Sequence, residues 1–272
     1  MVNYQVYNPS PELALFVKCF WSLEDATASA PVRQRVVPDG CMEMIFNYGD
    51  LYQQFFEDGT SLIQPRSFIF GQISRFIEIA PTGNTGIIAA RFFPEGLSPF
   101  IELPVSLLEN KAVDIQELFG EKGKLLEQEV LSATTNTGRI SLLEKFLLAR
   151  LGESHAIDMI TKGCVEVIMQ SNGQLDVAEL AEKMQLHRRN IERKFTNTIG
   201  MSPKQLARIV RLQSALKMLQ QKNFASLTSL AYENGYYDQA HFIKDFKEFT
   251  GISPKSFYAG NLQLAALFAT AE

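Results

Sequence analysis

The residues of this chain best suited to chemistry are basic side chains that gather in one forty-residue segment. Residues 183–222 carry a net charge of +9, because ten basic side chains stand against a single acid, Glu192. The ten are Lys183, Arg188, Arg189, Arg193, Lys194, Lys204, Arg208, Arg211, Lys217 and Lys222. A charge run of this kind is often only a solvated helix face, but clustered Lys and Arg are also the electrostatic footprint of phosphate binding.

A repeat supplies the elements that would position these side chains. Residues 176–258 contain one pattern twice, with its early positions offset by 50 residues and its later ones by 51. The first copy holds Leu180, Ala181, Leu186, Ile191, Phe195, Gly200, Ser202 and Pro203. The second copy holds Leu230, Ala231, Tyr236, Phe242, Phe246, Gly251, Ser253 and Pro254. Each copy predicts two short helices around a tight turn, the helix-turn-helix plan in which the second helix enters the DNA major groove.

In the first copy, Asp176 is expected to cap the first helix, and the second helix is expected over residues 188–198. Ile191 and Phe195 lie four residues apart and therefore face inward. Because arginine pairs with guanine and glutamate accepts from cytosine, base contacts are assigned to Arg189, Glu192 and Arg193. Arg188 and Lys194 are assigned to phosphate, a contact that positions the protein without specifying sequence.

In the second copy, Ser226 is the expected cap of the first helix, and the second helix is expected to start at Asp238. The helical spacing places three aromatic side chains inside, namely Phe242, Phe246 and Phe249. Base contacts are assigned to the opposite face, which holds Gln239, Ala240, His241, Ile243 and Lys244. This face is less basic than the first, so we expect it to bind more weakly and to discriminate more softly.

The segment between the copies, residues 202–222, is predicted to form one rigid helix with Pro203 at its first position. Its 21 residues span about 31 Å. One duplex turn is about 34–36 Å, so the two reading helices would reach adjacent major grooves. Further phosphate contacts are assigned to Lys204, Arg208, Lys247 and Lys255. An alternative for Arg208 and Arg211 is pairing within the protein, and Arg211 also lies beside the apolar stripe of this helix.

The first hundred residues favour short strands over 4–7, 41–46, 67–70, 75–79 and 86–93, separated by Gly and Pro turns. Short strands at this spacing predict a sandwich or small barrel. An early helix is expected from Pro11 to about Lys18, with Ser10 as its N-cap. After Pro104, apolar residues at three and four spacing predict helices over 107–151, which either pack on their own domain or supply a dimer seam.

The predicted fold class is therefore α+β, with a mainly β N-terminal sandwich or barrel (cupin-like), a helical linker and an all-α double helix-turn-helix domain. The predicted boundaries are 1–110 for a sensing or dimerisation domain, 111–156 for the connector, 157–260 for the helix-turn-helix domain and 261–272 for a tail. Three unpatterned cysteines favour a reducing compartment. No run of 18 apolar residues and no leader pattern are found, so we expect a cytoplasmic protein with no membrane partner.

These motifs resemble the C-terminal domain of the AraC/XylS family of bacterial transcription regulators. The matching segments are Leu186 with 191–195, 200–203, Arg211 with Ala215 and Leu219, 230–231 with 235–236, 241–242, 246–247 and 251–254. His187 stands where Ser is usual as a helix cap, Tyr236 replaces the usual Phe, and Tyr258 follows Phe257 where Arg is common. Segments 35–43, 70–72 and 91–94 resemble a less-studied N-terminal domain of some of these regulators.

The resemblance implies a partner, double-stranded DNA, and a role as activator or repressor. RNA polymerase is an implied partner if the protein is an activator. The resemblance also implies a variable N-terminal domain that senses a small-molecule effector or dimerises, so both an effector and a homodimer stay open. We assign an effector pocket to Trp21, Arg35, Glu43 and Arg91, although Trp21 also fits an ordinary core.

No catalytic residue, metal site or cofactor is predicted. The first histidine is His155, so residues 1–154 lack a three-histidine site, and Cys41 has no histidine in its own domain to activate it. Two other classes stay open. One is an N-terminal enzyme tethered to DNA by the C-terminal part, and the other is a protein-interaction module that binds no DNA.

Overall fold

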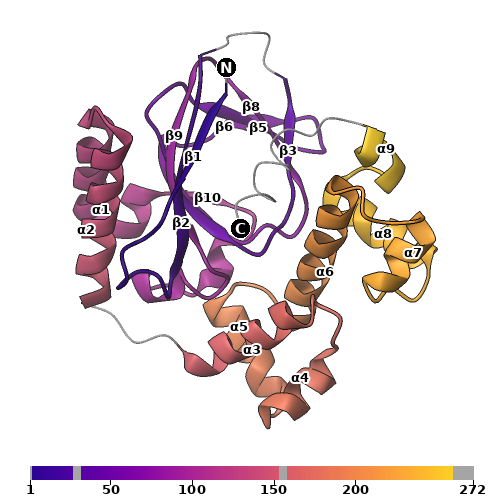
Figure 1. The fold of residues 1–272 in the computed structure, drawn as a ribbon. Coiled ribbons are helices and arrows are strands. Elements are labelled where there is room, and N and C mark those ends of the chain that lie inside the picture. Colours follow the sequence, from indigo (N-terminus) through magenta and orange to yellow (C-terminus); the bar gives the residue numbers. More distant parts are fainter. Residues whose placement is uncertain (1, 27–31, 153–157, 260–272) are drawn as a thin grey trace.

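Two antiparallel sheets face each other in the N-terminal half of the chain (Figure 1). The computed structural model describes residues 2–26, 32–152 and 158–259. The larger sheet has the order β1 (Asn3–Tyr7), β2 (Val17–Asp25), β9 (Thr85–Phe92), β4 (Met42–Asn47), β7 (Ser67–Phe70) and β10 (Ala112–Asp114). The smaller sheet has the order β3 (Gln34–Val36), β8 (Ile77–Pro81), β5 (Tyr52–Phe55) and β6 (Ser61–Ile63). The expected sandwich or barrel is confirmed.

Both faces of the inner strands of the larger sheet, β2, β9, β4 and β7, are mostly buried, and successive residues of a strand point to opposite faces. In β2, Phe20 belongs to a hydrophobic cluster on one face, while Trp21 belongs to a smaller cluster on the other. In β4, Met44 packs on the first face, and Glu43 lines a cavity on the second. The first face is covered by helices, whereas the second face looks into the space between the two sheets.

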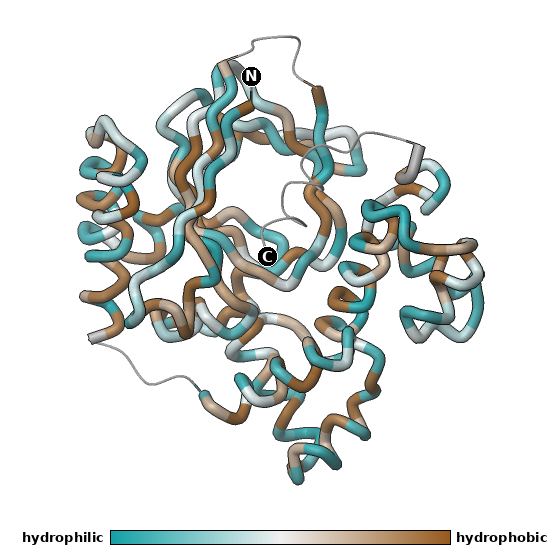
Figure 2. Tube along the Cα trace, in the orientation of Figure 1, coloured by the Kyte–Doolittle hydropathy of each residue, from teal (hydrophilic) through white to brown (hydrophobic). Residues whose placement is uncertain are grey.

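The helices that cover the first face follow β9 in sequence, two of them before β10 and two after it. Two short 3-10 helices, η1 (Ser98–Phe100) and η2 (Val105–Leu108), precede α1 (Ile115–Ser132) and α2 (Asn136–Gly152). Along α1 and α2 the chain alternates between hydrophobic and hydrophilic residues (Figure 2). Val130 and Leu143 are buried in the cluster that holds Phe20, and Phe146 of the proposed dimer seam is half-buried there. Of the predicted stripe Leu142, Phe146 and Ala149, the first two pack on their own domain, as one of the two expectations had it, and Ala149 is exposed.

The C-terminal half is all helical, as expected. Its elements are α3 (Met159–Gln170), α4 (Val177–Met184), α5 (Arg188–Thr198), α6 (Pro203–Gln220), α7 (Leu227–Glu233), α8 (Gln239–Thr250) and α9 (Pro254–Ala259). One hydrophobic cluster joins them and includes Ile191, Phe195, Phe242, Phe246 and Phe249. Every one of these five side chains was expected to face inward. In Figure 1, α6 lies between the group formed by α3–α5 and the group formed by α7–α9.

The early helix expected from Pro11 was wrong. Residues 11–16 form turns, and strand β2 begins at Val17 and pairs with β9. Ser10 caps no helix, and its backbone N–H instead donates to Glu144 Oε1 of α2 at 2.7 Å. Leu13 and Phe16 are buried in the core beneath the helices, so tertiary packing overrides the local helix signal. Strands β2, β3, β5, β6 and β10 were not expected.

Several expectations fall outside the described residues. These are the linker residues 153–154 and the tail 261–272. The first helix of the C-terminal half begins at Met159, with Asp158 as its N-cap. The central rod, α6, holds 18 residues and is capped by Ser202. At 1.5 Å per residue it is about 27 Å long, somewhat shorter than expected.

Candidate nucleic-acid interface

The first helix-turn-helix unit consists of α4 and α5. Asp176 caps α4 through a capping box with Glu179, as its sequence position predicted. Gln185 takes the left-handed conformation, φ 53°, and turns the chain toward α5. His187 makes no side-chain hydrogen bond as the N-cap of α5. The lack of a Ser at this position therefore leaves the first turn of α5 without the usual side-chain cap.

The outward face of α5 carries the side chains assigned to DNA. Arg189 and Arg193 are exposed, whereas Glu192 is half-buried and accepts a hydrogen bond from Arg188 Nε at 2.9 Å. An ion pair on a helix surface contributes little to stability, so Arg188 and Glu192 can leave this pair for contacts with DNA at a small cost in free energy. The positions of Arg189 and Arg193 leave both guanidinium groups in solvent, where a base edge can be reached.

Lys194 has a different role from the phosphate contact assigned to it. Its Nζ lies 2.5 Å from Asp158 Oδ2, so it ties α5 to the N-cap of α3. Burial would raise the pKa of Asp158, but the hydrogen bonds from Lys194 and Thr161 outweigh that effect and lower it. The assignment of Lys194 to phosphate was wrong, because its charge is held by Asp158.

The second unit consists of α7 and α8. Ser226 caps α7 through a capping box with Ser229, and Asp238 caps α8 by accepting from the His241 backbone N–H at 2.7 Å. Ala240, His241 and Lys244 are exposed on α8. The Gln239 side-chain oxygen accepts from Thr228 Oγ1 at 2.8 Å, which links α8 to α7.

Ile243 differs from its expected outward position. It is half-buried against the hydrophobic cluster of the C-terminal half. Its place one residue after Phe242 puts it at the border of the buried stripe, where a large side chain reaches the core. The outward face of α8 is therefore narrower than the sequence suggested.

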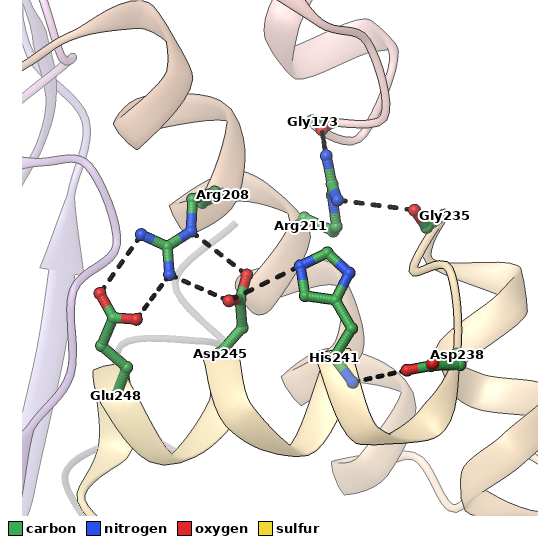
Figure 3. Close-up of polar contacts among 8 residues, drawn as sticks. All are labelled: Gly173, Arg208, Arg211, Gly235, Asp238, His241, Asp245 and Glu248. Atoms are coloured by element: carbon green, nitrogen blue, oxygen red, sulfur yellow. Dashed lines mark hydrogen bonds and ion pairs between the residues drawn. The ribbon is translucent and has the colours of Figure 1, made fainter.

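Arg208 of α6 is bound within the protein (Figure 3). Its guanidinium donates to Asp245 at 2.9 and 3.2 Å and to Glu248 at 2.7 and 3.3 Å. Burial alone would lower the pKa of Arg208, but the bonds to these two carboxylates outweigh it and raise the pKa above its usual value. The assignment of Arg208 to phosphate was wrong, and the alternative of internal pairing is confirmed. The pair fixes the reading helix α8 to the rod.

Arg211, one turn further along α6, bridges the two helix-turn-helix units. Its Nη2 donates to the carbonyl oxygen of Gly173 at 2.8 Å, and its Nη1 lies 3.5 Å from that of Gly235 (Figure 3). Gly173 precedes the first unit, and Gly235 lies in the turn of the second. Both glycines have φ near 70°, at 68° and 69°. A structural role for Arg211 was one of the two expectations, and it is confirmed.

The reading helices of both units border one groove. A groove of ≈ 850 Å³ is lined by Arg188 at the start of α5, by His241 and Lys244 in the first turns of α8, and by residues of α4 and α6 between them. Lys204 also lines it and is exposed. The acidic residues in the groove lie in internal contacts, since Asp176 and Glu179 form the capping box and Asp245 and Glu248 hold Arg208.

The N-terminal domain contacts the opposite ends of these helices. Residues of η2 pack against α5, and Val105 lies beside Gly200 at its C-terminal end. Phe76 lies beside Gly251 at the C-terminal end of α8. The first turns of α5 and α8 stay exposed as a result. Lys247 and Lys255, assigned to phosphate, are exposed on α8 and α9.

The residues assigned to an effector pocket separate into two groups. Trp21, Glu43 and Arg91 line a cavity of ≈ 90 Å³ between the two sheets. Arg35 lies outside it, because its Nε pairs with Glu78 Oε1 at 2.8 Å and its Nη1 donates to the Thr250 carbonyl at 3.3 Å. The assignment of Arg35 to the pocket was wrong, and Arg35 instead connects β3 to the end of α8.

A charged cluster occupies one end of this cavity. Arg91 pairs with Asp39 and, at 3.2 Å, with Glu43, which also accepts from Trp21 Nε1 at 3.1 Å. Burial raises the pKa of Glu43 to about 7, against the opposing effect of Arg91. Burial also raises the pKa of Cys41 to about 11, so Cys41 is a neutral thiol near neutral pH rather than a nucleophilic thiolate. Sequence reasoning missed Asp39, which only the fold brings to Arg91.

Two regions of the chain match known protein families. Residues 180–259 match the family described as "Helix-turn-helix domain", and residues 5–114 match "Domain of unknown function (DUF6597)". A protein of Haemophilus influenzae named "Uncharacterized HTH-type transcriptional regulator" is 28% identical over 163 residues, which cover 57% of this chain and 54% of that protein. A similarly named regulator of Staphylococcus aureus is 25% identical over 100 residues, covering 37% of this chain and 13% of that one. The chain thus spans about half, or less, of the length of these relatives.

Among solved structures, ToxT from Vibrio cholerae O395 is 11% identical, with a TM-score of 0.47, over 95% of this chain and 97% of that chain. The C-terminal domain of AraT, a response regulator from Geobacillus stearothermophilus, is 22% identical, with a TM-score of 0.35, over 37% of this chain and 84% of that one. In the described part of the chain, no helix has both the length and the apolar character needed to span a bilayer.

Proposed function

We propose that the protein is a sequence-specific transcription regulator of the AraC/XylS type that reads two adjacent major grooves with its C-terminal helix-turn-helix domain. One observation carries this proposal: Arg188, at the start of α5, and His241 and Lys244 of α8 line the same groove. A duplex that crosses this side meets both reading helices at once. The rod between them is about 27 Å long, which suits two grooves separated by about one turn.

Within this proposal the reading residues are those that the helices leave in solvent. Arg189 and Arg193 of α5, with Glu192, are the base-contacting group of the first unit. Gln239, Ala240, His241 and Lys244 form the corresponding group of the second unit. Arg188, Lys204, Lys247 and Lys255 are the phosphate contacts, because all four are exposed and Arg188 and Lys204 also line the groove.

The whole protein is proposed to act in the cytoplasm as a regulator, with double-stranded DNA as its partner. The N-terminal domain, residues 1–110, is proposed to sense a small-molecule effector or to dimerise. RNA polymerase is the further partner if the protein activates transcription. The helical pair α1–α2 then serves as part of the N-terminal body, since its apolar stripe packs there.

Gel-shift titration with a duplex from the protein's own upstream region tests this proposal. Binding is expected to weaken steeply with salt, because Lys and Arg release counterions from the phosphates. Arg193→Ala is expected to cost about 1–3 kcal/mol and to relax the preference at one base position. Lys145→Ala, an exposed cation on α2, is the charge-matched control and should bind as the wild type does. Unchanged sequence preference in the Arg193 variant would contradict the placement of the reading helix.

A further inference from the structure

The cavity between the two sheets has a mostly apolar lining with one cluster of charged side chains. Aromatic and aliphatic side chains from both sheets line most of it, including Trp21, Tyr52, Phe68 and Phe70. The charged groups in its lining are Asp39, Glu43 and Arg91. An apolar pocket with a few convergent polar groups is the usual form of a small-molecule site. Its volume of ≈ 90 Å³ limits the ligand to a handful of non-hydrogen atoms.

Above the pKa of Glu43, the charge that the cavity presents is negative. Two carboxylates, Asp39 and Glu43, surround the single guanidinium of Arg91. The Arg91 side chain is 3% exposed, whereas those of Asp39 and Glu43 are 21% and 18% exposed. The two carboxylate side chains are therefore the more accessible members of the cluster, and the arginine is the most buried. The raised pKa of Glu43, about 7, reflects the cost of holding this second carboxylate in a dry site.

A second group in the lining also seeks a donor. Asn47 is 1% exposed, and its Nδ2 points to the carbonyl oxygens of Pro65 and Arg66 at 3.5 and 3.2 Å. Its Oδ1 is buried and accepts no hydrogen bond from any described residue. A buried acceptor without a partner is costly, and a ligand N–H relieves that cost. Asn47 and Glu43 both belong to β4 and face the same cavity.

From these contacts we infer that the cavity binds a small cation that donates N–H bonds, an ammonium or guanidinium group on a compact apolar body. The carboxylates of Glu43 and Asp39 neutralise its charge. Asn47 lies four residues further along β4, about 13 Å away, so its Oδ1 accepts from a separate N–H donor in the same cavity. The aromatic rings add attraction between a cation and a π face. This inference rests on the proposed function, because it names the effector class that the N-terminal domain senses.

The same cluster is connected to the rod of the DNA-binding domain. Loop 37–41 connects the charged cluster to α6. Within this loop, Asp39 pairs with Arg91. The Pro38 carbonyl accepts from Gln213 Nε2 of α6 at 2.6 Å, and Val37 belongs to the hydrophobic cluster of the C-terminal half. A cation that draws Asp39 away from Arg91 shifts this loop against α6. Binding in the cavity thereby changes the contact between loop 37–41 and α6, the helix that holds both reading helices.

Tryptophan fluorescence of the full chain tests the binding step directly. Trp21 is the one tryptophan of the sequence, and it donates to Glu43 inside the cavity. Methylammonium, guanidinium and tetramethylammonium chlorides are titrated at constant ionic strength against sodium chloride and sodium acetate, with thermal melting in parallel. We expect at least one N–H cation to give a saturable change in Trp21 emission and a rise in melting temperature. Acetate should give neither change.

The variants make the test specific. Glu43→Gln is expected to weaken cation binding by at least about tenfold, because a charged hydrogen-bond partner is lost. Glu121→Gln, on the exposed surface of α1 with its side chain 70% exposed, is the matched control and should bind as the wild type does. Stabilisation by acetate, an equal response in both variants, or no saturable response to any cation would overturn the inference.

The coupling step has its own readout. The cation that binds is added to a gel-shift titration with the upstream duplex, and the change in DNA affinity is measured for the wild type and for Gln213→Ala. The variant is expected to bind the cation, by Trp21 emission, while the effect of the cation on DNA affinity falls at least about threefold. An unchanged effect would overturn the role of loop 37–41. Failure of DNA binding itself, with cation binding intact, would refute the proposed function instead.

Discussion

Arg208 offers the sharpest test of how the two helix-turn-helix units are held together. We consider Arg208→Met, which removes the guanidinium and keeps most of the aliphatic stem. Asp245 is then left with its side chain 5% exposed and without its bidentate partner, while His241 Nε2 lies 3.9 Å from its Oδ1. The exposed Glu248, at 38%, regains water and contributes little.

The magnitude follows from this burial. Removing one partner of a buried ion pair typically costs about 3–5 kcal/mol, because the other charge stays buried and unpaired. Arg208 is itself 26% exposed, so the lower end of that range applies, and we expect a loss of about 3 kcal/mol in the free energy of unfolding. The double variant Arg208→Met with Asp245→Asn removes the stranded charge and should recover most of the loss.

Urea unfolding followed by circular dichroism at a helix wavelength measures the stability, and gel-shift titration over a range of salt concentrations measures the DNA contact. An internal pair predicts lower stability and an unchanged salt dependence. A phosphate contact predicts the reverse, with unchanged stability and a slope of log K against log salt that is smaller by about one. The second pattern would refute the assignment of Arg208 to the inside of the protein.

Three further predictions concern local structure. Burial raises the pKa of Glu43 to about 7, whereas a glutamate in the unfolded chain has a pKa of about 4.3. Between these two pH values the folded protein holds a proton that the unfolded chain has released, so the free energy of unfolding should fall by up to about 3 kcal/mol as pH rises from about 4.3 to about 7. Urea unfolding curves at a series of pH values measure this fall, and Glu43→Gln should flatten it. Gly173→Ala should destabilise by at least about 2 kcal/mol, because a Cβ there would lie 2.0 Å from the Ala207 carbonyl oxygen, whereas Gly59→Ala, with a similar positive φ but nothing within 4 Å, should cost about 1 kcal/mol; equal melting temperatures for the two variants would argue against the close approach. Asp176→Ala removes the capping box of α4 and should cost about 1 kcal/mol in the same unfolding assay.

The helices of the C-terminal half were predictable because their signals are local. The stripes of Leu, Ile and Phe repeat at helical spacing, and Asp176, Ser202 and Ser226 occupy the cap positions that the pattern requires. The exposed positions of Arg189 and Arg193 follow from the same period, since Ile191 and Phe195 define the inward face. These features depend on residues within a turn or two of one another.

The strands and the charged contacts depend on residues far apart in the chain. Ser10 and Pro11 carry a local helix signal, yet the next residues are drawn into a strand whose two faces meet different clusters, Phe20 on one and Trp21 on the other. Arg91 and Asp39 are 52 residues apart in the chain, and Arg208 is 37 and 40 residues from its partners Asp245 and Glu248. No spacing rule connects such residues before the fold is known.

Hydroxyl-radical footprinting on the bound upstream duplex tests the central claim most directly, namely that α5 and α8 read successive major grooves on one side of the DNA. The account predicts two protected patches whose centres lie about 10–10.5 base pairs apart, on the same face of the helix. Arg193→Ala should weaken one patch, and Gln239→Ala should weaken the other. A single patch, or two patches on opposite faces of the duplex, would contradict the account.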